Sequence, residues 1–153
     1  MSQLLINLIL NSRGDNMEIW KDIVGYEGMY QVSNMGRVRS LDRIIVYKDG
    51  RVWNCKGRIL SIHDNGKGYK FVRLSKYGKP KQEYIHRLVA TAFIDNQDNL
   101  PEVNHKDENK ENNCVYNLEW CSREYNHGYG TARQRQAEQH KKTNKVKRYV
   151  NNK

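Results

Sequence analysis

Short apolar segments alternate with glycine-containing turns between residues 20 and 84, and this spacing restricts the region to short antiparallel strands. Turns are predicted at Gly36, Gly50, Gly66 and Gly78, and the Asp-Gly pair that ends at Gly50 is a frequent hairpin turn. The segments between the turns are predicted as strands, over residues 30–33, 37–41, 44–47, 59–62, 69–74 and 83–85. We therefore expect a β-rich region over residues 17–83.

The predicted strands also carry regularly spaced basic side chains. In residues 37–39 and 70–74, alternation predicts apolar side chains on one face and Arg or Lys on the other. The net charge is +10 over residues 36–81 and +7 over 130–153, whereas residues 82–129 carry −5. Two basic segments around an acidic centre favour a polyanionic partner, because each neutralised phosphate releases counterions. The residues predicted to contact DNA are Arg37, Arg39, Arg43, Arg58, Lys70, Arg73, Arg133, Arg135, Lys141 and Lys142.

Composition excludes several other classes of protein. Only 37% of the residues are hydrophobic, and no apolar stretch approaches the roughly 18 residues that span a bilayer, so no membrane partner is expected. The three cysteines lack CxxC spacing, which argues against a disulfide scaffold and for a reducing compartment such as the cytoplasm. Residues 1–16 are expected to be a poorly structured leader, and Met17 is a second candidate for the start of translation.

The pattern changes after residue 84. Apolar positions at helical spacing predict a helix over residues 86–94, followed by a strand over 103–105 and an Asn-rich polar loop over 106–117. A second strand over 118–121 leads to Ser122, which can cap a short helix. A basic polar helix or tail is expected over 130–153. The predicted fold class is thus α+β.

A His on the first strand, an Asn-rich loop, a second strand and an Asn on the following helix resemble the ββα-metal core of HNH endonucleases, in particular homing enzymes of the phage intron and free-standing types. The segments that carry the resemblance are YIHRLVA (84–90), VNHKD (103–107) and NLEW (117–120), with Asn126 beyond them. Residues 20–28, 30–34 and 36–40 (WKDIVGYEG, YQVSN and GRVRS) are similar to a module often fused to these nucleases. The nuclease core is therefore predicted over 84–129.

The resemblance implies a role for each residue of the core. His105 corresponds to the general base, and an imidazole with an ordinary pKa near 6.5 suits that task. Asn117 corresponds to the residue that ties down the loop and orients the base. Asn104 and Asn126 correspond to the ligands of one divalent metal, Mg²⁺ or Mn²⁺.

One departure weakens this assignment. The family often has Asp at the position of Asn104, and two neutral amides bind a hard cation less strongly than carboxylates do. Asp107 is an alternative source of a carboxylate, and His127 competes with Asn126 for the third motif position.

Two simpler interpretations concern the remaining His, Cys and Trp residues. A zinc site is formally available from His105, Cys114, Cys121 and His127, but the spacing lacks paired ligands, so zinc is not expected and the cysteines are predicted to be small apolar residues. His86 is predicted to be structural. The tryptophans, Trp20, Trp53 and Trp120, are predicted to belong to the core.

The function implied by the resemblance is metal-dependent hydrolysis of phosphodiester bonds in double-stranded DNA. A monomer or weak dimer, encoded by a phage or prophage and acting in the cytoplasm of a bacterial host, is the expected context. Two alternatives stay open. One is a DNA-binding protein that has lost nuclease activity, and the other is a protein that binds or cuts RNA.

Overall fold

The structure is a computed structural model that describes residues 17–131, together with residues 134 and 137. Ten short strands and two helices follow one another in these residues, with a single 3₁₀ turn, η1, before the last strand. The strands are β1 (Trp20–Asp22), β2 (Tyr30–Ser33), β3 (Val38–Ser40), β4 (Arg43–Val46), β5 (Val52–Cys55), β6 (His63–Asp64), β7 (Lys70–Lys76), β8 (Lys79–Tyr84), β9 (Glu102–His105) and β10 (Leu118–Cys121). The helical elements are α2 (Ile85–Phe93), η1 (Val115–Asn117) and α3 (Arg123–Gly128).

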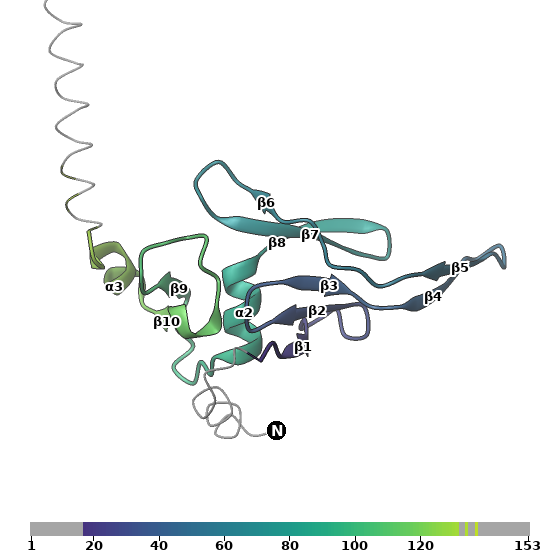
Figure 1. Cartoon of the computed structure of the whole chain (residues 1–153), viewed down its shortest axis with the longest axis horizontal. Helices are drawn as coiled ribbons and strands as arrows, with labels where there is room; N and C mark the ends of the chain where they lie inside the picture. The colour runs from purple at the N-terminus through teal and green to yellow at the C-terminus, as the bar shows by residue number, and fades with distance from the viewer. Residues whose placement is uncertain (1–16, 132–133, 135–136, 138–153) are drawn as a thin grey trace, which may run out of the picture.

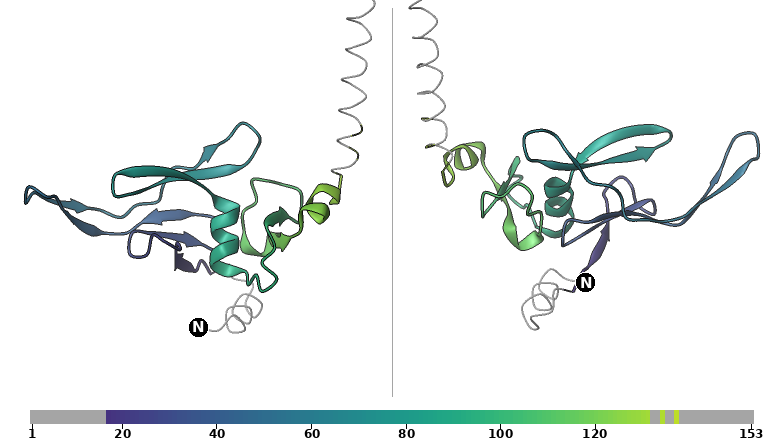
Figure 2. Two further views of the ribbon diagram at one scale, coloured as in Figure 1. Left: turned by 180° about the vertical axis from the view of Figure 1, so that it is seen from behind. Right: turned by 45° about the horizontal axis from the view of Figure 1, so that its top comes forward.

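The strands form four small antiparallel sheets. β1, β2 and β3 make one three-stranded sheet and β6, β7 and β8 another, while β4–β5 and β9–β10 are two-stranded. Between β2 and β3, Gly36 has φ +82°, a left-handed conformation that favours glycine in a tight turn. In Figures 1 and 2, the β4–β5 hairpin projects from one end of the molecule, and α3 lies near the opposite end.

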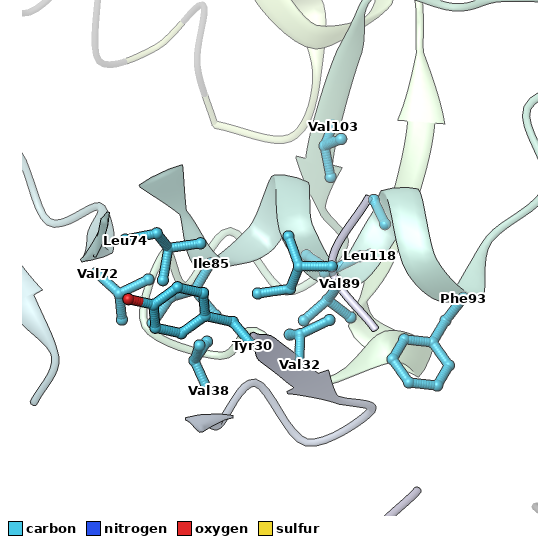
Figure 3. Packing of buried hydrophobic residues seen from close by; sticks show 12 residues of the cluster. Tyr30, Val32, Val38, Val72, Leu74, Ile85, Val89, Phe93, Val103 and Leu118 are labelled. Carbon is cyan, nitrogen blue, oxygen red and sulfur yellow. The ribbon is translucent and has the colours of Figure 1, made fainter. Parts of the chain in front are cut away.

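One hydrophobic core joins these pieces (Figure 3). The centre of the core is helix α2, whose buried side chains pack against strands on both sides of residue 84. The fully buried members include Val32 and Val38 from the first sheet, Leu74 from β7, Val89 from α2 and Leu118 from β10. The core therefore continues across the predicted boundary between residues 83 and 84.

A buried asparagine adds a polar link between the first sheet and the later loop. The Asn34 side chain accepts a hydrogen bond from the Ile19 backbone N–H at 2.7 Å, and its backbone carbonyl accepts one from Val115 at 2.8 Å. Asn34 is 2% exposed, so both hydrogen bonds are shielded from water.

Several predicted elements are confirmed. The hairpin of β2 and β3, strands β9 and β10, and the helix now designated α2 lie within one or two residues of the predicted positions. Ser122 caps α3 by accepting a hydrogen bond from the Tyr125 N–H at 3.2 Å. The strand–loop–strand–helix order expected for residues 103–128 is present.

Three predictions were wrong. Residues 59–62 do not form a strand, because in this segment Ile59 makes only an isolated bridge to Arg39. Trp53 is 61% exposed and does not belong to the core, since β4 and β5 pair only with each other. Lys70 does not lie on the face of β7 opposite the apolar side chains. It is two residues before Val72 and so lies on the same face as Val72, at the end of the strand, where its ammonium group pairs with two carboxylates.

The leader (1–16) and most of the predicted basic tail lie outside the described residues, as do Arg133, Arg135, Lys141 and Lys142. In the part of the chain that the structure describes, no helix is long and apolar enough to cross a membrane.

Candidate functional site

Strands β9 and β10 form an antiparallel ribbon that presents different residues on its two faces. Asn104 lies opposite Glu119 in the register, and Glu102 is two residues before Asn104, so these three side chains share one face. Helix α3 covers this face, since the Asn126 side chain on α3 donates a hydrogen bond to the Glu102 carboxylate. Val103 and Leu118, on the other face, belong to the core around α2.

The end of this ribbon opens into a hollow of about 380 Å³. The hollow brings together His105, Asn104 and Asn126, the three residues predicted to act together. The remaining lining residues come from β9, the loop that follows it, the residue before β7 and the region of α3; they are Tyr69, Glu102, Val103, Glu108, Lys110, His127 and Tyr129.

The hydrogen bond that His105 makes determines which nitrogen of its ring is free. Its Nε2 lies 3.1 Å from Oδ1 of Asn113. The Asn113 amide nitrogen donates to the Glu111 carbonyl at 3.0 Å, so Oδ1 is the acceptor and Nε2 carries the proton. In the neutral ring, Nδ1 then holds the lone pair, and no residue of the described chain donates a hydrogen bond to it.

Burial lowers the pKa of His105 from its ordinary value, and the positive charge of Lys110 lowers it further. The hydrogen bond that Nε2 donates to Asn113 and the negative charge of Asp107 oppose part of this shift. His105 is only 5% exposed, which accounts for the dominance of burial. The imidazole is therefore neutral at pH 7 and able to accept a proton.

Asn117 holds the loop that follows His105. Its amide nitrogen donates to Asp107 Oδ1 at 2.9 Å and to the Asn112 carbonyl at 2.8 Å, and its Oδ1 accepts from the Asp107 N–H at 3.1 Å. The backbone of Lys106 adds a hydrogen bond to the Asn117 carbonyl at 2.8 Å. One buried side chain thus fixes both ends of the loop beside His105.

The same contacts occupy Asp107. Its second oxygen accepts a hydrogen bond from the Asn112 amide at 2.7 Å, and this contact is the main reason that the pKa of Asp107 is lowered. Asp107 does not line the hollow, whereas His127 does. Of the two alternative positions, only His127 lies beside Asn104 and Asn126.

Each predicted metal ligand is tethered to a glutamate. The Asn104 amide nitrogen donates to Glu119 Oε1 at 2.9 Å, and the Asn126 amide nitrogen donates to Glu102. Because the nitrogens face the carboxylates, both amide oxygens are left without a hydrogen-bond donor from the described residues. Amide oxygens beside carboxylates suit a hard divalent cation such as Mg²⁺ or Mn²⁺.

The residues of the alternative zinc site are not assembled. Within residues 17–131, no group of three His, Cys, Asp or Glu side chains is placed to hold a metal ion. Cys121 is 4% exposed, and burial raises the pKa of its thiol to about 11, so it stays protonated. The Cys114 thiol lies 3.8 Å from the Met35 carbonyl, against the first sheet.

The sequence and fold of this chain are similar to those of known proteins. A family model described as the NUMOD4 motif matches residues 18–75. The DNA endonuclease I-HmuI of Bacillus phage SP01 is 40% identical over 107 residues, which are 70% of this chain and 54% of the relative. An uncharacterized HNH endonuclease of Acanthamoeba polyphaga mimivirus, L245, is 43% identical over 83 residues, 54% of this chain and 25% of that protein.

A solved structure agrees with the sequence matches. It is described as DNA binding and cleavage by the HNH homing endonuclease I-HmuI, and it is similar with a TM-score of 0.61 and 38% identity over 81% of this chain and 66% of that chain. The chain belongs to the HNH homing endonuclease family. It spans about half the length of the I-HmuI endonuclease and a smaller share of the mimivirus relative.

Several of the basic residues predicted to contact DNA lie in the part of the chain that the structure describes. Arg37 is paired with Glu18, and Lys70 is paired with Asp64 and Glu111, so neither carries an uncompensated charge. The other predicted DNA-contacting residues differ in exposure. Arg39 and Arg43 are half-buried: Arg39 bonds to Gln31 and lies over Trp20, and Arg43 lies over Tyr30. Arg58 and Arg73 are exposed.

Sequence reasoning about this HNH protein missed an aromatic wall beside His105. The ring centroids of His86 and His105 are 5.3 Å apart, and Tyr69 lies 5.3 Å from His86 and 6.3 Å from His105. Burial lowers the pKa of His86 to about 3, so this ring stays uncharged. The alternation in β7 could have placed Tyr69 on a half-buried face, but no local signal indicates that it reaches the site.

Proposed function

We propose that this chain is a metal-dependent endonuclease that hydrolyses phosphodiester bonds in double-stranded DNA. The observation that carries the proposal is the convergence of His105, Asn104 and Asn126 on one hollow. The similarity to I-HmuI, whose solved structure is described as DNA binding and cleavage, supports the same reaction class.

His105 is the general base in this proposal. Its Nδ1 accepts a proton from the attacking water, while Nε2 keeps its own proton and its hydrogen bond to Asn113. Asn113 therefore stabilises the ring in the required tautomer, and Asn117 keeps the loop that carries Asn113 in place. Both are positioning residues, because they act through His105.

Asn104 and Asn126 would hold one divalent metal, Mg²⁺ or Mn²⁺, through their amide oxygens. A bound divalent cation neutralises charge on the scissile phosphate and on the leaving oxygen. Glu102 and Glu119 contribute by orienting the two amides and by adding negative charge near the neutral ligands. This arrangement offsets the absence of Asp at the position of Asn104.

The DNA duplex is the proposed partner of the basic surface. Arg58 and Arg73 are exposed, and the half-buried Arg39 guanidinium lies over the Trp20 ring on one face of the first sheet. We expect a monomer or weak dimer acting on DNA in the cytoplasm of a bacterial host, as a phage or prophage product. Phosphate contacts of this kind predict steep weakening of binding with salt.

The direct test is nicking of supercoiled plasmid, and of long DNA, with Mg²⁺ or Mn²⁺ supplied. The wild type is expected to cut only with metal, and His105→Ala and Asn126→Ala are each expected to cut about 100-fold more slowly. Asn54→Ala replaces an exposed Asn on strand β5, outside the hollow and outside the loop that holds His105, and serves as the matched control. Failure of the wild type to cut, or normal cutting by His105→Ala, would refute the proposal.

A DNA-binding protein without nuclease activity is the second candidate. The observation that favours it is the amide of Asn104 at a position where a carboxylate would bind metal more strongly. Salt-dependent binding to duplex DNA without metal-stimulated cutting would establish this alternative. Preference for structured RNA in a competition experiment would exclude both candidates.

A further inference from the structure

A second hollow, of about 530 Å³, adjoins the one that contains His105. The two share four lining residues: Tyr69, Glu102, Val103 and Asn126. The rest of the second hollow comes from the turn before β7, the start of α2, Pro101 and the first residue of α3. A molecule that fills the first hollow can therefore continue into the second.

Cationic side chains from three separate elements line the second hollow. They are Lys67 from the turn before β7, Arg87 from the first turn of α2, and Arg123 from the first turn of α3. Glu102 is the single carboxylate in the lining, and it pairs loosely with Arg123, at 3.7 Å. The walls therefore carry a net positive charge.

The Arg87 guanidinium and the backbone of Lys67 are held in place where they line the hollow. Arg87 donates to the Pro101 carbonyl at 3.1 Å, and its guanidinium lies over the ring of Trp120. The backbone carbonyl of Lys67 accepts a hydrogen bond from Lys110 Nζ at 3.0 Å. Since Lys110 also lines the first hollow, this contact joins the walls of the two sites.

The remaining walls are neutral. Tyr84, His86 and Asn65 line the hollow beside the cations, and the Asn65 amide lies 3.5 Å from the Tyr84 hydroxyl. His86 is uncharged at neutral pH because it is buried among aromatic rings, so it does not add to the positive charge. The positive charge of the hollow therefore comes from its Lys and Arg side chains, and Glu102 offsets part of it.

We propose that this second hollow is a subsite for a DNA backbone phosphate next to the one that is cut, bound by Lys67, Arg87 and Arg123. The inference rests on the proposed nuclease function. Each strand of a duplex carries one phosphate per ~3.4 Å of axis, so a backbone lying across the first hollow places a neighbouring phosphate close to the second. A phosphodiester anion also matches Arg and Lys donors that converge from different elements.

Equilibrium binding to duplexes with single neutral linkages tests the subsite. Each duplex carries one methylphosphonate, placed in turn along the footprint of the protein, and binding is measured with metal withheld so that no cutting occurs. One neutral linkage is expected to weaken wild-type binding by about tenfold, because it removes the charge that the subsite recognises.

The test variant is Lys67→Gln combined with Arg123→Gln. It is expected to bind the unmodified duplex more weakly than the wild type does. It should also lose the response to the neutral linkage, so that this linkage changes its affinity by less than about twofold. Its salt slope should also fall by about 0.9, the value for one phosphate contact. The matched control, Lys48→Gln with Arg51→Gln, makes the same charge change at the tip of the β4–β5 hairpin, at the far end of the molecule (Figure 1).

The control should keep the full response to the neutral linkage. Thermal unfolding of each variant, followed by circular dichroism, verifies that the binding measurements compare folded proteins. If the test variant still discriminates that linkage as strongly as the wild type, the subsite is refuted.

The outcome is separable from that of the proposed function. A chain that never cuts DNA but loses the linkage response in the test variant would retain the subsite and refute the nuclease. If the chain cuts DNA with metal but the wild type and the test variant respond equally to the linkage, the nuclease proposal stands and the subsite is refuted.

Discussion

The loop of residues 106–117 and the β4–β5 hairpin both lie outside the two three-stranded sheets, but they differ in how they are stabilised. The loop is held by its own Asn and Asp side chains, which bond to backbone groups at Asn109, Glu111 and Asn112. The hairpin exposes large apolar side chains: Ile44 is 69%, Val46 67% and Trp53 61% exposed.

This difference indicates where geometry matters. Hydrogen bonds are directional, so the bonded loop fixes the position of His105, whereas the hairpin is an isolated two-stranded ribbon with little tertiary support. Substitutions in the loop should therefore reduce both stability and cutting, and substitutions in the hairpin should have smaller effects on both.

The largest expected contrast compares two asparagines. Asn117→Ala removes the buried side chain that bonds Asp107 and Asn112 and leaves partly buried backbone groups without partners, at an expected cost of about 2–3 kcal/mol in the free energy of unfolding. Asn54→Ala, on the exposed strand β5, should cost less than about 0.5 kcal/mol. Urea unfolding of both variants measures the contrast, and equal costs would contradict it.

Acid should act on the site and its aromatic wall rather than on the hairpin, which contains no histidine. His86 has a folded-state pKa of about 3 against an ordinary value of 6.5, so below pH 6.5 the unfolded chain takes up a proton that the folded chain does not. This group therefore stabilises neither state at pH 7 and favours unfolding as the pH falls toward 3.

At pH 4.5, the expected loss of stability from His86 is about 2–3 kcal/mol relative to pH 7. Urea unfolding at both pH values, for the wild type and for His86→Phe, isolates this contribution from that of the carboxylates. An equal loss in both proteins would show that His86 is not the source.

Cutting should depend on pH through His105. Burial lowers its pKa below 6.5, and only the neutral ring can accept a proton, so single-turnover rates should be flat from about pH 7 upward and fall below the lowered pKa. Asn113→Ala removes a hydrogen bond that raises this pKa, and should move the midpoint further toward acid. A midpoint above 6.5 would contradict this account.

The smallest expected effect is in the hairpin itself. Trp53→Ala should change the free energy of unfolding by less than about 0.5 kcal/mol, because the side chain is mostly exposed. The buried Val89→Ala, in helix α2, is the contrasting variant and should cost about 2 kcal/mol or more. A large effect of Trp53→Ala would mean that the hairpin packs against something in solution.

These contrasts also mark what the sequence could predict. Local patterns were sufficient for the β2–β3 hairpin, for α2 and for the strands around His105, since turn residues and periodicity act over a few positions. Trp53 was misplaced because burial depends on whether a third strand pairs with the hairpin, which no local pattern records.

The candidate site shows the same limit. Motif order predicted that His105, Asn104 and Asn126 act together, and they line one hollow, but the partners that orient them come from register and packing. Glu119 reaches Asn104 through the β9–β10 register, and Glu102 reaches Asn126 through the packing of α3. Lys67 and Arg87 come from different elements, and only the fold places both in the lining of the second hollow.

The central claim is that His105 and Asn126 act on one reaction from one hollow. Single-turnover cutting of duplex DNA by the wild type, His105→Ala, Asn126→Ala and the double variant tests it most directly. Residues that serve the same step should give non-additive losses, so the double variant is expected to cut about as slowly as the slower single variant. Losses that multiply in the double variant would show that the two residues act independently and would contradict the account.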